Sequence, residues 1–147
     1  MNEQRNKGGR PRKFNYDSAL ATALNLFMQH GYDALSISDL TREMGIAAPS
    51  LYGTFGNKAD LYKKTLELYE RRNETTNSLL LGHADIKSAL SDWLTQIVIN
   101  ATRQGSPSGC IISCGMLYTS DDNGELADIH RDRRRAMMDR LEIMLEK

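Results

Sequence analysis

The sequence predicts an all-α protein. Only three prolines occur in 147 residues, and apolar residues recur at spacings of three and four, which is the period of an amphipathic helix. No segment shows the alternation expected of a strand. Hydrophobic residues make up 40% of the chain and charged residues 26%, which is ordinary for a globular protein of this length with its own core.

The first predicted segment is a basic arm over residues 1–14. It contains glycine and proline, and residues 1–13 hold five basic side chains against one acidic side chain, a local net charge of +4 in a chain whose total is zero. Basic arms of this kind contact phosphates, so Arg10, Arg12 and Lys13 are candidate DNA contacts. We expect the arm to be flexible until it binds a partner.

The first helix is predicted from Asn15 or Asp17, either of which can cap it, to about residue 30. Gly31 suits a left-handed stop at its end. Five apolar residues share one face and form the predicted core side: Ala19, Leu20, Ala23, Leu24 and Phe27.

Two short helices follow. Ser36 stands three residues before Asp39, a variant of the capping box, and opens a helix that ends at Gly45. Pro49 suits the first turn of the next helix, which runs to about residue 55, because the N–H that proline lacks has no helical partner there. A fourth helix begins near Lys58 and passes residue 71.

Three more helices are predicted at about 86–102, 108–118 and 124 to the end, with loop-like segments between them. The chain therefore divides into the arm at 1–14, a first helical domain at 15–62 and a second helical domain at 63–147. His83 and His130 are isolated in sequence, and we expect both on the surface or in loops.

The two short helices and the turn between them form a helix-turn-helix unit, whose second helix enters the major groove of DNA. Small residues at the start of that helix allow a close approach: Ala47, Ala48, Pro49 and Ser50. Tyr52 and Lys58 would flank it as phosphate contacts. For Tyr52 a structural role is the alternative, with its ring packed and its hydroxyl exposed.

Residues 10–70 resemble the DNA-binding domain of the TetR/AcrR family of bacterial transcriptional repressors. The "GRPRKF" lead-in, "DLTREMGI" and "PSLYGTFGNK" are similar to a subgroup with a basic arm. The positions that carry the resemblance are Phe27, Gly31, Tyr32, Ser36, Ile37, Asp39, Leu40, Gly45, Ile46, Leu51, Tyr52, Phe55, Asn57, Lys58 and Leu61.

The resemblance implies a role for each matching position. Ser36 would contact a phosphate and Ser38 a base, while Tyr52 and Lys58 hold the DNA backbone. Ala48, Pro49 and Ser50 would face the bases or their phosphates, and Arg10 and Arg12 would enter the adjacent minor groove. The chain departs from the family at Ala47, Gly53 and Thr54. With fewer polar groups there, base readout would be thin, although Thr54 remains an expected contact.

The resemblance implies a repressor that is released from a palindromic operator by a small-molecule effector. The partners would be double-stranded DNA and a second copy of the chain in a homodimer, and the location would be the cytoplasm. The second domain would bind the effector and dimerise, and we expect it to be incomplete in this sequence. Effector-pocket candidates are Trp93, Ile97, Cys110, Cys114, Met116 and Met137, although most such residues simply fill a core.

Other function classes find little support in the sequence. Two cysteines are too few for a disulfide framework, and no histidine or third cysteine stands at metal-ligand spacing. We expect no metal, no cofactor, no enzymatic activity and no membrane span. Two alternatives stay open: a redox- or electrophile-sensing helical module that acts through Cys110 and Cys114, and a helical interaction domain that does not bind DNA.

Overall fold

The computed structural model describes residues 15–82, 85–105, 107, 109–117 and 123–146. The predicted arm, with Arg10, Arg12 and Lys13, lies outside the described residues, as does His83. Within the described ranges the chain is all-helical, as predicted. The helices are α1 (Tyr16–His30), α2 (Ile37–Met44), α3 (Ala48–Phe55), α4 (Lys58–Gly82), α5 (Ile86–Thr102), α6 (Ile111–Cys114) and α7 (Gly124–Leu145).

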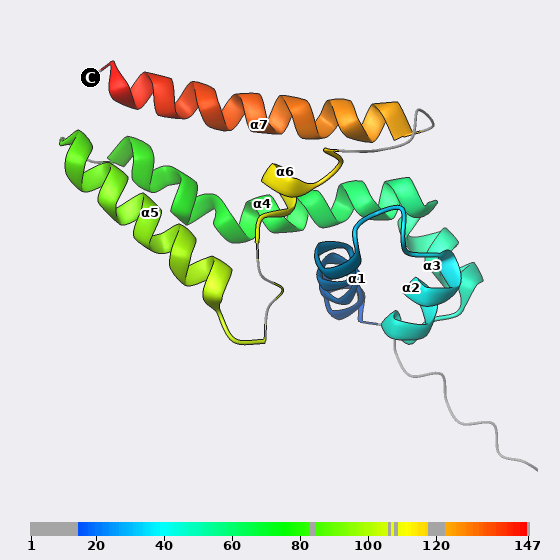
Figure 1. Cartoon of the computed structure of the whole chain (residues 1–147). Helices are drawn as coiled ribbons and strands as arrows, with labels where there is room; N and C mark the ends of the chain where they lie inside the picture. Colours follow the sequence, from blue (N-terminus) through cyan, green and yellow to red (C-terminus); the bar gives the residue numbers. More distant parts are fainter. Residues whose placement is uncertain (1–14, 83–84, 106, 108, 118–122, 147) are drawn as a thin grey trace, which may run out of the picture.

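Helices α1, α2 and α3 gather against the first half of α4, at the end of the molecule opposite the last residues of α7 (Figure 1). Apolar residues that recur at helical spacing point into one shared core, and burial of each large side chain stabilises it by about 1.5–3 kcal/mol. The members exposed by 2% or less include Leu20, Leu24, Phe27, Leu40, Leu51, Phe55, Leu61, Tyr62 and Leu66.

The long helix α4 connects the two halves of the molecule. Its first part packs on α1 and its second part on α5, where a smaller core contains Ala89, Trp93 and Met144. The proposed domain division after residue 62 falls inside this helix. One continuous helix therefore passes through both proposed domains.

Helix α7 lies alongside α4 and runs in the same direction (Figure 1). Ion pairs join the two helices: Lys63 Nζ lies 2.5 Å from Glu125 Oε1, and Arg133 Nε lies 2.6 Å from Glu70 Oε1. A hydrogen bond also links these helices, because Tyr62 Oη lies 2.9 Å from Nε2 of His130, which is completely buried. The expectation of a surface histidine at position 130 was therefore wrong.

The predicted helix over 108–118 is also wrong in its extent. Helix α6 has four residues, preceded by Gly109 at φ 98° and followed by Gly115, whose backbone is extended. A Cβ at position 115 would collide with the carbonyl oxygen of Ile111 and the ring of His130. Arg134 donates hydrogen bonds to the carbonyl oxygens of Ile112 and Gly115, which holds the chain in this non-helical path.

Candidate nucleic-acid interface and ligand cavities

The start of α2 is held by the predicted capping box. The Ser36 hydroxyl accepts a hydrogen bond from the Asp39 N–H at 3.1 Å and donates one to the Asp39 carboxylate at 2.6 Å, which also accepts from the Ser36 N–H at 3.1 Å. The hydrogen bonds from Ser36 hold the pKa of the Asp39 carboxyl below its usual value, and the nearby Arg42 guanidinium adds a smaller effect in the same direction. Gly45 then ends α2 in the left-handed conformation, at φ 67° and ψ 32°.

Helix α3 presents one buried and one exposed face. Leu51 and Phe55 are almost fully buried, and the Phe55 ring stacks on Tyr16 with centroids 5.0 Å apart. The opposite face carries no charged side chain, and Tyr52 on it is 52% exposed. Ala47 caps the helix without a side-chain hydrogen bond, so first-turn N–H groups stay available to an anion such as a phosphate.

Lys58 lies at the start of α4, with Nζ 4.2 Å from the centroid of the Tyr32 ring. Burial lowers the pKa of this ammonium group, and nearby Asp33 partly opposes the shift. The first turn of α4 is already capped, because Asn57 and Asp60 exchange backbone-to-side-chain hydrogen bonds of 3.0 and 2.9 Å. The Asp60 carboxylate therefore already occupies this helix end, and a phosphate contact here would depend on the Lys58 ammonium group.

The structure brings the described candidates together on α2, α3 and the start of α4, at one end of the molecule (Figure 1). The exposed members are Ser36, Ser38, Ala47, Pro49, Ser50, Tyr52 and Thr54, and the half-buried ones are Ala48 and Lys58. Of these, Ser36 already makes a capping hydrogen bond. A phosphate contact by its hydroxyl would share or replace that bond.

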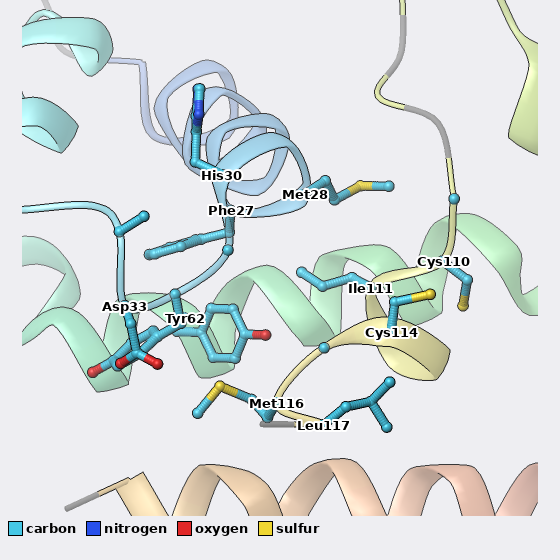
Figure 2. A pocket seen from close by; sticks show the side chains of 15 residues that line it. Phe27, Met28, His30, Asp33, Tyr62, Cys110, Ile111, Cys114, Met116 and Leu117 are labelled. Carbon is cyan, nitrogen blue, oxygen red and sulfur yellow. The ribbon is translucent and has the colours of Figure 1, made fainter. Parts of the chain in front are cut away.

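The six predicted effector-pocket residues divide between two cavities. The larger, of about 570 Å³, is lined by Trp93, Ile97 and Met137, and the smaller, of about 440 Å³, by Cys114 and Met116. Cys110 lines both. In Figure 2 the two cysteines lie on the α6 segment at one side of the smaller cavity, and Phe27, Asp33 and Tyr62 lie at the other side.

The larger cavity contains polar residues that the sequence analysis missed. Asn100 Nδ2 donates to Asn73 Oδ1 and Thr76 Oγ1, both at 3.1 Å, and thereby joins α5 to α4. Arg72, Arg103, Arg133 and Arg140 also line it. The polar pair Asn73 and Thr76, three positions apart on one helix, is the sequence signal for this part of the cavity, whereas the predicted pocket residues are apolar residues and cysteines.

The Cys110 thiol lies between the two cavities. Burial raises its pKa, but hydrogen bonds with Ser113 and Tyr69 and with backbone groups outweigh that effect, so the net pKa is below the ordinary value. Cys114, at the other end of α6, is exposed.

No three His, Cys, Asp or Glu side chains are grouped as metal ligands in the part of the chain that the structure describes. None of the helices in that part is long and apolar enough to cross a membrane.

Comparison with known proteins agrees with this arrangement. A family model described as "Bacterial regulatory proteins, tetR family" matches residues 19–65, which contain α2, α3 and the start of α4. The HTH-type transcriptional repressor ComR of Escherichia coli (strain K12) is 36% identical over 134 residues, and BdcR of the same strain is 35% identical over 112 residues. These alignments cover 90% and 74% of this chain, which spans 63% and 54% of the two relatives.

Solved structures extend the similarity beyond the helix-turn-helix. A cysteine-substituted variant of the TetR family transcriptional regulator CifR, in complex with a 26-bp double-strand operator DNA, superimposes with a TM-score of 0.86 at 27% identity. The match covers 94% of this chain and 72% of the CifR chain. A second CifR structure with operator DNA gives a TM-score of 0.79.

Proposed function

Because the chain belongs to the TetR family of bacterial regulatory proteins, we propose that it is a transcriptional repressor that binds operator DNA as a homodimer in the cytoplasm. The observation that carries this proposal is the exposed face of α3. Its first turn consists of small residues, it carries no charged side chain, and Leu51 and Phe55 anchor its opposite face in the core, so the start of the helix can approach the floor of the major groove closely. The superposition on CifR bound to operator DNA supports the same reading.

In the proposed complex α3 enters the major groove with its first turn toward the bases. Pro49, Ser50 and Thr54 face the bases or their phosphates, and Tyr52 contacts the DNA backbone. A second copy of the chain places its α3 in the next major groove, about 34–36 Å away along a palindromic operator. The basic arm adds contacts in the neighbouring minor groove.

The larger cavity is the proposed effector site. It lies among α4, α5 and α7 and also touches Leu24 and Met28 of α1, which belongs to the helix-turn-helix half. An effector that favours one position of α4 would shift the spacing of the two α3 helices in the dimer. Such a ligand acts only as far as its affinities for the bound and released states differ.

Fluorescence anisotropy with two duplexes tests the DNA proposal. One duplex carries the DNA upstream of the gene for this chain, and the other is a shuffled duplex of the same composition. We expect tighter binding to the first, with an affinity that falls steeply as the salt concentration rises. Equal and weak affinity for both duplexes would favour the non-DNA-binding interaction domain.

A matched pair of lysine variants tests the contact surface. Lys58→Ala should lower the slope of log affinity against log salt by about one unit, because one phosphate contact is lost. Lys87→Ala removes the same charge from the exposed start of α5 and should leave the slope unchanged. Equal slopes for the two variants would remove Lys58 from the DNA contacts.

A second candidate is thiol-based control, which is favoured by the position of Cys110 between the two cavities and by hydrogen bonds that lower its pKa below the ordinary value. Alkylation with N-ethylmaleimide should then weaken operator binding in the unmodified chain and in Cys114→Ser. It should leave Cys110→Ser unaffected. If alkylation has the same effect on Cys110→Ser as on the unmodified chain, this candidate is wrong.

A further inference from the structure

The larger cavity has an excess of positive charge. Among the Asp, Glu, Lys and Arg residues of its described lining are Glu70 and four arginines. Arg133 and Glu70 neutralise each other, since Nε and a terminal nitrogen of Arg133 donate to the two carboxylate oxygens at 2.6 and 3.1 Å. Arg72, Arg103 and Arg140 have no ion pair with any residue that the structure describes. Three unpaired guanidinium groups around one cavity create a positive potential that attracts an anion.

The buried part of the same lining is mostly apolar, with Thr76 as its polar member. Trp93 and Ile112 are 7% and 8% exposed, and the half-buried Met137 packs against the cluster that contains Trp93. The cavity volume of about 570 Å³ falls within the range of roughly 300–1,000 Å³ that ligand sites occupy. The three unpaired arginines, in contrast, are exposed. A ligand that fills this space therefore needs an apolar body against Trp93 and a polar group toward the arginines.

We propose that the larger cavity binds a small organic anion with a flat apolar body, such as an aromatic carboxylate. The planar guanidinium group pairs with a carboxylate through two parallel hydrogen bonds, and it favours this group over a neutral amide or a cation. The inference rests on the proposed function for the identity of the cavity as an effector site, but the binding itself requires no DNA.

Two probes of the same shape test the charge preference. Isothermal titration calorimetry of the 147-residue chain with 2-naphthoate and with neutral 2-naphthamide should show about tenfold tighter binding of the carboxylate. Arg72→Gln and Arg140→Gln should each remove most of that difference. The matched controls are Arg71→Gln and Arg135→Gln, which alter exposed arginines of the same two helices outside the cavity lining. Both control variants should retain the preference for the carboxylate.

The position of the bound probe can be read from Trp93, the only tryptophan in the chain. Its indole N–H resonance in a ¹⁵N-labelled sample should shift on addition of 2-naphthoate, because the naphthalene ring lies close to it. Equal or tighter binding of the amide, an unchanged indole resonance, or no binding of either probe would overturn the inference. Loss of operator binding alone would count against the proposed function, since calorimetry and NMR use no DNA.

Discussion

Tyr62 Oη and His130 Nε2 lie 2.9 Å apart inside the protein, across 68 positions of sequence. On its other side, His130 Nδ1 lies 3.4 Å from the carbonyl oxygen of Ile112. A carbonyl only accepts, so Nδ1 carries the proton of the neutral ring, and Nε2 accepts from the Tyr62 hydroxyl. The histidine of α7 thus joins α4, on the side of the helix-turn-helix, to the short helix α6 that borders both cavities.

Replacing Tyr62 with phenylalanine should destabilise the protein by about 1–3 kcal/mol, because His130 Nε2 stays buried without a donor. Urea unfolding followed by circular dichroism measures the change. Tyr52→Phe removes a hydroxyl from an exposed ring and should alter the free energy of unfolding by less than about 0.5 kcal/mol. Similar losses in both variants would show that the buried hydrogen bond contributes nothing specific.

Stability should fall in mild acid because His130 resists protonation. Burial lowers the pKa of His130 below 6.5; Arg134 and Arg133 act in the same direction, whereas the Ile112 carbonyl and Glu70 oppose it. Between the pKa of His130 in the folded chain and its higher pKa in the unfolded chain, the unfolded chain binds more protons. The contribution of His130 to the free energy of unfolding therefore decreases as pH falls below about 6.5 and is constant above that pH.

Urea titrations between pH 8 and pH 5 test this dependence. His130→Gln should show a shallower decline than the unmodified chain. His30→Gln, which changes an exposed histidine at the end of α1, should show the same decline as the unmodified chain. An undiminished decline in His130→Gln would assign the acid sensitivity to other groups.

The capping box predicts a contrast between two serines of α2. Ser36→Ala removes the hydroxyl that bonds to Asp39 and should cost about 0.5–2 kcal/mol of stability. Ser38→Ala, at an exposed position inside the same helix, should change stability by less than about 0.5 kcal/mol. Thermal unfolding of the two variants compares them directly, and an equal effect would contradict the role of the cap.

Replacing each of two glycines with alanine should change the stability of the protein in opposite directions. Gly53 is in a helix with open space around it, so Gly53→Ala should stabilise α3 by up to about 1 kcal/mol. Gly115→Ala should destabilise by about 1–3 kcal/mol, since the new methyl group meets the Ile111 carbonyl and the His130 ring. Chemical denaturation measures both, and stabilisation by Gly115→Ala would disprove the close approach.

The start and end of the early helices were predictable because their signals are local. Asn15 caps α1 through the Ser18 N–H at 3.0 Å, and Ser36 and Gly45 bound α2 as expected. The extent of α6 was not predictable in this way. Its limit at Gly115 depends on His130 and Arg134 of α7, which approach it only in the folded chain.

The all-α class, the helix-turn-helix and its exposed residues follow from the order of residues, because caps, breaks and apolar spacing act within one or two turns of helix. The tertiary structure alone decided that His130 is buried against Tyr62, that Lys58 lies over Tyr32, and that Arg72 and Arg140 share one cavity. These relationships join segments that are distant in sequence. They arise when the apolar faces of the helices pack together, and the local sequence of a segment does not indicate which other segment will pack against it.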